Sequence, residues 1–502
     1  MEGSVDRSEV PPSAFTDPVG ADEGPPREFV ESAVDALLTA CASAGDRSPL
    51  PADPAVPSAE IPETGRPPRA LIDDLETLIE GSMNPAHPGY VGHMDTVPAT
   101  ASVVGDAVAA AINNNMLSVE LSPVCSALEA GLIETVADAF GLGPEAGGVL
   151  TSGGSLANLQ ALAVARNRAF DVDAGNSGES DVDVKREGLV GVDARPVVLV
   201  SEVAHTSIRK AAMLLGLGTD AVVPVETDAN DRLRPDALAR TIDRLREEDA
   251  APFCVVATAG TTTTGNVDPI DAIADVAADG DLWCHVDAAY GGALVLSDRH
   301  RDRLAGIERA DSVTFNPQKW WYVAKTCAMA LFADESVLDE SFRIGAPYMR
   351  DDGVRNRGEV SIQGTRHADA IKLWLTIRQL GRRGLESLID GSHRLAHRLY
   401  EGVTERSALE AATEPETNVV CFRAAPEWRP PETRDDLNDR LQRRLLRDHD
   451  VFVSLPTYRG ERWLRTVLLN PFTDESVVDR LLAGIDETLH ADRVRWEREE
   501  RE

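Results

Sequence analysis

Short apolar runs alternate with segments of helical periodicity through the middle of the chain. The runs are largely continuous rather than alternating, and they lie at residues 147–152, 196–202, 221–226, 252–260, 282–292 and 312–316. Continuous apolar strands between helices predict an α/β fold with a mostly parallel sheet covered on both faces. Ligands bind at the carboxyl ends of the strands in such sheets, so polar residues there are candidates for a functional site.

The region before this sheet has a different pattern. Residues 1–65 are rich in Pro, Ser, Asp and Glu, and one amphipathic stretch at 28–44 predicts a helical arm behind a disordered tip. Helical periodicity then runs from Thr100 to Phe140 and breaks near Ser122-Pro123, where a second helix is expected to begin.

The carboxyl-terminal region predicts a smaller domain. Beyond about residue 376 the pattern gives a helix, then strands at 418–424, 451–456 and 466–470, with helices at 434–449 and from about 474. We therefore predict three parts, namely a disordered tip and helical arm at 1–65, a large α/β domain at 66–375, and a small α+β domain at 376–502.

Composition narrows the class of protein. The chain has 502 residues, of which 43% are hydrophobic, and this is enough for a large core. It contains no apolar run of membrane-spanning length and no secretion signal at its start, so we expect a cytoplasmic protein without a membrane partner. The six cysteines lack CxxC pairing and predict neither a metal site nor a disulfide framework.

The charge balance argues against a nucleic-acid partner and indicates a salt-rich environment. The formal net charge is −34, and the only lysines are Lys185, Lys210, Lys319, Lys325 and Lys372. Such a charge repels itself in dilute buffer and is screened at about 1 M salt, where the Debye length is about 3 Å. We expect a halophilic protein from a salt-rich cytoplasm; an acidic protein of a mesophile is the alternative.

Two candidate features follow the first predicted strands. Gly153-Gly154-Ser155 lies in TSGGSLAN (151–158), where backbone N–H groups and a hydroxyl could hold a phosphate at the start of a helix. A plain strand-to-helix turn explains the glycines equally well. His205 could stack on a flat ligand, although a single histidine is more often a helix cap or a core residue.

Asp287 and Lys319 follow later strands and carry more information. Asp287 ends an apolar strand, where a carboxylate is costly unless it meets a cation such as a protonated ring nitrogen; a metal ligand or a helix cap is the alternative. Lys319 lies between an apolar strand and two tryptophans, where desolvation lowers the pKa of an amine and makes it nucleophilic toward aldehydes. A surface lysine over aromatic rings also fits, but this chain uses arginine almost everywhere else.

The order of these features predicts the cofactor. A phosphate loop, a stacking histidine, a buried aspartate and then a lysine about thirty residues later, each at a strand end, form the arrangement that pyridoxal 5'-phosphate (PLP) requires. We therefore predict a PLP enzyme that carries its cofactor as an imine on Lys319.

The sequence also resembles the group II PLP-dependent amino-acid decarboxylases, which include the glutamate, aromatic amino-acid, histidine and diaminobutyrate decarboxylases. The resemblance is carried by Ser122-Pro123 with Glu129, TSGGSLAN (151–158), SEVAHTSIRKAA (201–212), TAGTTTTGNVDPI (258–270), HVDAAYGG (285–292), NPQKW (316–320) and IQGTRHADAIKLW (362–374). It is close over about residues 85–380 and looser at the ends. It implies a large domain of fold type I, the PLP-dependent transferase-like fold, and a homodimer with shared active sites.

The resemblance implies roles for individual residues. Lys319 would bind the cofactor, Asp287 would pair with the pyridine nitrogen, and His205 would stack on the ring. The residues implied to line the ring or to hold the phosphate are Gly153, Gly154, Ser155, Thr262, Ala289 and Asn316, and the turn at Gly364-Thr365 would reach the partner subunit's cofactor phosphate. Tyr348, in the segment 340–357, would protonate the α-carbon, and His87 and Tyr90 would contact the substrate.

Two positions depart from the family pattern. Gln318 replaces the histidine that usually precedes the lysine, and residues 87–93 read HPGYVGH in place of the commoner His-Pro followed by aromatic pairs. The implied reaction is decarboxylation of an L-amino acid to its amine and CO2, with glutamate, aspartate or 2,4-diaminobutyrate expected ahead of an aromatic substrate. The alternatives are another PLP reaction on the same scaffold, transamination or carbon–carbon cleavage, and a non-catalytic PLP-binding protein.

Overall fold

The computed structural model of the chain describes residues 9–20, 23–170, 183–344 and 355–499. It divides into two compact units, which are described separately. Unit 1 comprises Met1–Val91, Arg440–Val453 and Phe472–Glu502, and unit 2 comprises Gly92–Asp439 and Ser454–Pro471. The domain boundaries expected at residues 65 and 375 stay predictions.

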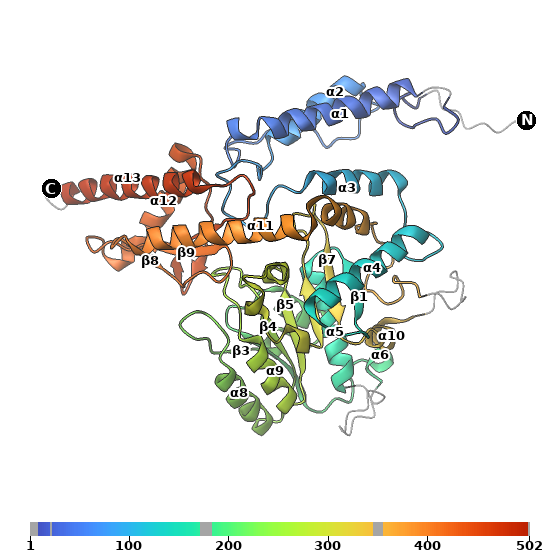
Figure 1. Ribbon diagram of the computed structural model, residues 1–502, viewed down its shortest axis with the longest axis vertical. Coiled ribbons are helices and arrows are strands. Elements are labelled where there is room, and N and C mark those ends of the chain that lie inside the picture. Colours follow the sequence, from blue (N-terminus) through green and yellow to red (C-terminus); the bar gives the residue numbers. More distant parts are fainter. Residues whose placement is uncertain (1–8, 21–22, 171–182, 345–354, 500–502) are drawn as a thin grey trace, which may run out of the picture. The chain divides into compact units, whose positions relative to one another are not determined.

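Unit 2 is built around a seven-stranded sheet with the strand order β1-β7-β6-β5-β4-β2-β3 (Figure 1). The strands are β1 (Gly147–Thr151), β2 (Arg195–Ser201), β3 (Val222–Val225), β4 (Ala250–Thr258), β5 (Trp283–Ala288), β6 (Ser312–Phe315) and β7 (Ala328–Phe332). Strands β3, β2, β4, β5 and β6 pair in parallel, and β7 is antiparallel to both of its neighbours. The predicted fold type I architecture with a mostly parallel sheet is thus confirmed.

Side chains that alternate along the central strands enter separate cores on the two faces of this sheet. Leu199, Val255 and Val286 belong to the largest core, together with side chains of α4, α8 and α9. Val198 and Cys254 belong to a second core with side chains of α5 and α7. The sheet is therefore buried on both faces, which is the physical reason for the continuous apolar runs. The bounds of these helices are α4 (Pro123–Phe140), α5 (Gly154–Phe170), α7 (Ser207–Leu214), α8 (Pro235–Glu247) and α9 (Ile270–Asp279).

The remaining elements of unit 2 include a second, small sheet. Its strands are β8 (Leu409–Ala411), β9 (Val419–Ala424) and β12 (Leu464–Val467) in the order β12-β9-β8, and β10 (Thr457–Tyr458) pairs with β11 (Glu461–Arg462). The remaining helices are α3 (Thr100–Ile112), α6 (Val184–Glu187), α10 (Ser336–Phe342), α11 (Ala370–Thr404) and the first part of α12 (Arg434–His449). The strand expected at 451–456 does not form; within that described segment, Phe452 and Ser454 make only isolated bridges.

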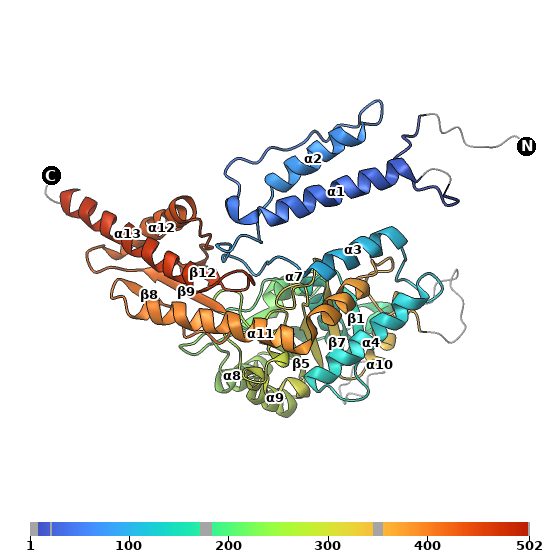
Figure 2. The ribbon, with the colours of Figure 1, turned by 45° about the horizontal axis from the view of Figure 1, so that its top comes forward.

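Unit 1 is largely helical. It contains α1 (Gly24–Ala42), α2 (Pro68–Glu80), α13 (Glu475–Glu499) and most of α12, from Arg440 onward. Helices α1 and α2 pack side by side (Figure 2). The helix expected at 28–44 corresponds to α1, whereas the sequence pattern does not predict α2. No described helix of either unit is long and apolar enough to cross a membrane.

Candidate active site

The topology of the sheet brings the predicted site residues of unit 2 to one edge. Because β1 and β6 are both antiparallel to β7, β1 runs in the same direction as the five parallel strands. The carboxyl ends of β1, β2, β4, β5 and β6 therefore share an edge of the sheet. Gly154 follows β1, His205 follows β2, Thr262 follows β4 and Lys319 follows β6. Asp287 lies within β5, one residue before its end.

The candidate phosphate loop joins β1 to α5. Gly153 has a φ of +126°, which favours glycine, and a Cβ on Gly154 would lie 2.8 Å from the side-chain amide of Asn316. Asn316 is buried, and its Oδ1 atom has no hydrogen-bond partner among the described residues. Oδ1 only accepts hydrogen bonds, but the Nδ2 group of the same carboxamide is a donor, so Asn316 beside a glycine-lined helix start could donate to a phosphate oxygen. Ser155 lies exposed in the first turn of α5.

Asp287 lies at the end of β5 and is buried, with 6% of its surface exposed. Its Oδ2 atom accepts a hydrogen bond from Asn158 Nδ2 at 2.9 Å, and its Oδ1 atom accepts one from Ala289 N at 3.2 Å. Each carboxylate oxygen thus accepts one hydrogen bond from an amide N–H group, which fixes the orientation of the carboxylate. A carboxylate held in this way can bind a protonated ring nitrogen, which fits the pyridine ring of PLP.

Lys319 follows β6 and lies against aromatic rings. Its Nζ atom is 5.9 Å from the centroid of the Tyr290 ring, and Tyr290 stacks on Trp320 with a centroid distance of 5.1 Å. Burial lowers the pKa of Lys319, and the Asp287 carboxylate acts in the opposite direction. A lowered pKa provides more of the neutral amine that attacks an aldehyde.

His205 follows β2, and it is an exposed residue whose ring orientation is nevertheless fixed. Its Nδ1 atom lies 2.8 Å from Ser207 Oγ, and it accepts a hydrogen bond from Ser207 N at 3.2 Å. The surrounding protein lowers the pKa of His205 by desolvation, against an opposite effect of Asp287. The imidazole is thus favoured in its neutral form, which can lie flat against an aromatic ring.

The other predicted ligands of the cofactor lie in the loops of unit 2. Thr262 is exposed after β4, and Ala289 is half-buried directly after β5. Thr365 is exposed, and its Oγ1 atom accepts a hydrogen bond from Asn115 Nδ2 of the same chain at 3.3 Å. Its predicted contact with a partner's cofactor stays a prediction.

Two predicted substrate residues, His87 and Tyr90, belong to unit 1 and are buried. His87 Nδ1 accepts a hydrogen bond from Gly89 N at 2.9 Å, and the Tyr90 ring packs on Phe452 with a centroid distance of 5.4 Å. Their role toward the substrate stays a prediction. Tyr348 lies outside the described residues.

Gln318, at the position that departs from the family pattern, is used for structure. Its side-chain Oε1 atom accepts a hydrogen bond from Cys327 N at 2.6 Å, and its backbone N–H donates to Cys327 O at 3.2 Å. Both bonds connect the turn that holds Lys319 to the residue before β7. The amide therefore braces the lysine loop, and it has no acidic proton to exchange with a substrate.

Arg465 on β12 is a buried residue near the candidate site that sequence reasoning missed. Its Nη1 atom donates to Thr262 O at 2.7 Å, and its Nη2 atom donates to Gly92 O at 3.0 Å. Its charge is among those that lower the pKa of Lys319. The sequence could have indicated Arg465, because it directly precedes the apolar run TVLLN (466–470). A charged side chain in a short apolar strand requires buried polar partners.

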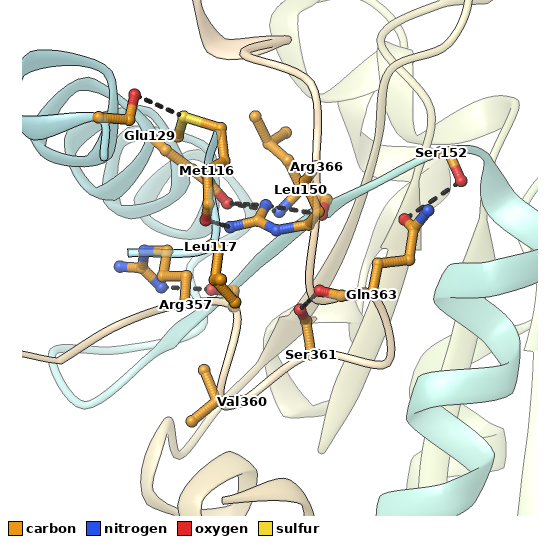
Figure 3. A network of polar contacts seen from close by, with 12 residues as sticks. Met116, Leu117, Glu129, Leu150, Ser152, Arg357, Val360, Ser361, Gln363 and Arg366 are labelled. Atoms are coloured by element: carbon orange, nitrogen blue, oxygen red, sulfur yellow. Dashed lines mark hydrogen bonds and ion pairs between the residues drawn. The ribbon is translucent and has the colours of Figure 1, made fainter. Parts of the chain in front are cut away.

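A buried ion pair contacts β1, the strand that precedes the candidate phosphate loop. Arg366 Nη1 lies 2.7 Å from Glu129 Oε1, and this oxygen also accepts a hydrogen bond from Leu150 N at 3.0 Å. Figure 3 shows the Arg366 side chain beside Leu150 and the Gln363 side chain reaching Ser152. The segment 361–366 is thereby attached to β1 and to the start of the phosphate loop.

Comparison with protein families gives a match over most of the chain. Residues 52–425 match the pyridoxal-dependent decarboxylase conserved domain. The chain is 31% identical over 442 residues to the human acidic amino acid decarboxylase GADL1, covering 85% of this chain and 82% of that protein. It is 32% identical over 416 residues to the L-2,4-diaminobutyrate decarboxylase of Acinetobacter baumannii, covering 82% of each.

Solved structures have the same fold. The apo form of mouse CSAD is 27% identical, with a TM-score of 0.84 over 94% of this chain and 99% of that one. The Oryza sativa TDC with PLP and tryptamine is 25% identical, with a TM-score of 0.84 over 94% and 99% of the two chains.

Proposed function

This chain belongs to the pyridoxal-dependent decarboxylase family, the group II amino-acid decarboxylases, and from that membership we propose that it decarboxylates an acidic L-amino acid. It is accordingly a PLP-dependent carboxy-lyase. The observation that best supports the proposed site is the arrangement of the Lys319 amine, the Asp287 carboxylate and the Asn316 cradle at one edge of the sheet.

The proposed roles of the residues follow from their surroundings. PLP supplies an aldehyde for covalent attachment of the substrate and a ring that withdraws an electron pair from its α-carbon. Lys319 would form the covalent attachment, and Asp287 would hold a proton on the ring nitrogen. His205 would pack on the ring, while Gly154 and Asn316 would hold the phosphate. Tyr348 stays our candidate for the residue that returns a proton to the α-carbon.

A buried cation beside one of the predicted ring-lining residues favours an acidic substrate. Arg465 is buried and its Nη1 atom donates to Thr262 O, so its positive potential acts at the segment that carries Thr262. The same potential would attract a substrate carboxylate or sulfinate. Relatives named for acidic amino acids and for cysteine sulfinic acid support this ranking. The diaminobutyrate decarboxylases among the relatives make L-2,4-diaminobutyrate the second candidate.

The test is CO2 release by the PLP-loaded protein in about 1 M KCl, where a strongly acidic surface is screened. The panel contains L-glutamate, L-aspartate, L-cysteine sulfinate, L-2,4-diaminobutyrate, L-tyrosine, L-tryptophan and L-histidine. Lys319→Ala should abolish both turnover and the visible absorption of bound PLP, whereas Lys185→Ala changes an exposed lysine and should change neither. Release from an aromatic substrate alone would refute the acidic assignment. A keto acid product without CO2 would instead indicate transamination.

We also propose a homodimer that is active in high salt. Exposed apolar side chains on α3, including Val104 at 52% and Ile112 at 47% exposure, support a covered surface in the assembled protein. The net charge of −34 supports adaptation to salt. Light scattering on the purified protein in 2 M KCl tests the dimer, and a monomer at all concentrations would contradict it. CO2 release in 0.1 M and 2 M KCl tests the activity in high salt, and activity only in 0.1 M KCl would contradict that proposal.

A further inference from the structure

Asn158 of α5 lies at the centre of a buried hydrogen-bond network behind Asp287. The residue is 1% exposed. Its Nδ2 atom donates to Asp287 Oδ2 at 2.9 Å and to Ser207 Oγ at 2.9 Å. Its Oδ1 atom lies 3.1 Å from His285 Nε2. Both Nδ2 protons and one Oδ1 lone pair are thus used, and they contact two segments of the sheet edge, namely β5 through Asp287 and His285 and the start of α7 through Ser207.

The charge of Asp287 fixes which way this carboxamide points. An ionised carboxylate only accepts hydrogen bonds, so the NH2 group of Asn158 must face it and the Oδ1 atom must face His285. His285 Nε2 must then carry a proton to donate to Oδ1. At its other side, His285 Nδ1 lies 2.8 Å from Ser312 Oγ, which already accepts a hydrogen bond from Trp283 Nε1 at 2.8 Å. The Ser312 hydroxyl is therefore free to donate to Nδ1.

The same logic extends to His205. Ser207 Oγ accepts from Asn158 Nδ2, so its own proton can point to His205 Nδ1, where the Ser207 backbone N–H also donates. His205 Nδ1 is then an acceptor, and its proton resides on Nε2. A chain of directed bonds thus runs from Ser312 through His285, Asn158 and Ser207 to His205, with Asp287 attached at its centre.

We propose that Asn158 is a positioning residue for the cofactor site: it orients the Asp287 carboxylate, and it sets His285 as its Nε2–H tautomer. Asn158 itself touches no reacting atom. Through the Ser207 hydroxyl it also holds the ring of His205. The effect on the cofactor rests on the proposed function of Asp287, whereas the tautomer of His285 does not, so the two parts can be tested separately.

The tautomer is tested on the cofactor-free protein labelled with 15N-histidine. Long-range 1H–15N correlation spectra distinguish Nδ1–H from Nε2–H imidazoles, and His205→Gln and His285→Gln variants assign the two signals. Both rings should be Nε2–H in the wild type, and His285 should lose this single form in Asn158→Leu. An Nδ1–H His285 in the wild type would overturn the proposal, whatever the fold of any variant.

The effect on the cofactor is tested by PLP affinity. Loss of one hydrogen bond to a charged group should weaken PLP binding by about 10- to 100-fold in Asn158→Leu, and kcat should fall while KM changes little. The control is Asn167→Leu, a buried asparagine of the same helix that bonds Arg166 and should leave both quantities unchanged.

Asn158→Asp is a second variant that keeps the shape of the side chain. It places a carboxylate against Asp287, so PLP should bind poorly at pH 8 and recover as the pH falls and one proton is shared. Wild-type PLP affinity of this variant at pH 8 would overturn the role of Asn158. Absence of CO2 release from every protein, the wild type included, would reject the proposed function and leave the tautomer result standing.

Discussion

Arg366 Nη1 lies 2.7 Å from Glu129 Oε1, and both side chains are buried. Replacing the arginine leaves a buried carboxylate without its cation, and such changes cost about 3–5 kcal/mol. We expect Arg366→Leu to lower the free energy of unfolding by that amount, as measured by urea denaturation in 2 M KCl. Arg383→Leu, at an exposed position of α11, should change it by less than about 0.5 kcal/mol. Similar losses for both variants would show that the buried pair has no special role.

Lys319 should destabilise the cofactor-free protein. Burial lowers the pKa of its amine in the folded state below the usual 10.5. Between the folded and unfolded pKa values the unfolded chain binds more protons, so stability rises with pH across that window. Lys319→Met should therefore be more stable than the wild type at pH 7, with the difference shrinking toward pH 10. Urea denaturation of the apo proteins tests this, with Lys185→Met as control; a less stable Lys319→Met at pH 7 would contradict it.

The proposed phosphate cradle has no space for a methyl group at Gly154. A Cβ there would lie 2.8 Å from the Asn316 amide, so Gly154→Ala must displace the side chain proposed to hold the phosphate. We expect PLP affinity to fall at least tenfold, since displacing one charge-assisted hydrogen bond costs about 1.5 kcal/mol or more. Gly131→Ala on α4, where a Cβ meets no atom within 4 Å, should leave PLP affinity unchanged. Equilibrium titration of the apo proteins with PLP measures both.

His393, a buried histidine outside the candidate site, should make the protein sensitive to acid. His393 stacks on His300 with a centroid distance of 3.9 Å, and desolvation, His300, Arg303 and His397 lower its pKa to about 3. Between about pH 3 and 6.5 the unfolded chain binds the extra proton, so stability falls as the pH drops below 6.5. His393→Phe should reduce this loss by on the order of 1 kcal/mol at pH 5. Urea denaturation at pH 7 and 5 provides the comparison, with the exposed His490→Phe as control.

Salt should stabilise the fold through screening. The net charge of −34 creates repulsion that about 1 M salt confines to about 3 Å. We expect Tm to rise by several degrees between 0.1 M and 2 M KCl, since about 1 kcal/mol shifts Tm by a few degrees in a protein of this size. Sucrose at matched water activity stabilises without screening, and an equal rise in sucrose would assign the effect to preferential exclusion rather than to charge.

The sequence predicts the fold where a local pattern is sufficient. Continuous apolar runs identified six strands of the large sheet, but β7 was missed, because the short run around Met329 reads equally well as buried helix or strand. The expected strand at 451–456 does not form, because Phe452 and Ser454 each bridge a different partner, Tyr90 and Arg465. The apolar residues of this segment do not determine which partners it pairs with.

Residues of the candidate site were predictable as types but not as a network. Asp287 and Lys319 stood out because ionisable groups at apolar strand ends require partners. The connection between His285 and Asn158 joins positions 127 residues apart, and no local pattern carries it. The structural role of Gln318 could not be predicted from local sequence either. Its hydrogen bonds go to Cys327, which directly precedes β7, a strand that the sequence pattern does not predict.

The position of β7 also determines how much of the chain must be synthesised before the proposed phosphate site can form. The loop after β1 and the residue after β6 form the two sides of the proposed phosphate cradle, but β1 and β6 are not neighbours, and β7 lies between them. On the ribosome, β7 is the last of the three to be synthesised, so Gly154 and Asn316 can meet only after residue 332 has emerged. A chain shorter than this lacks the strand that lies between the two sides of the proposed phosphate site.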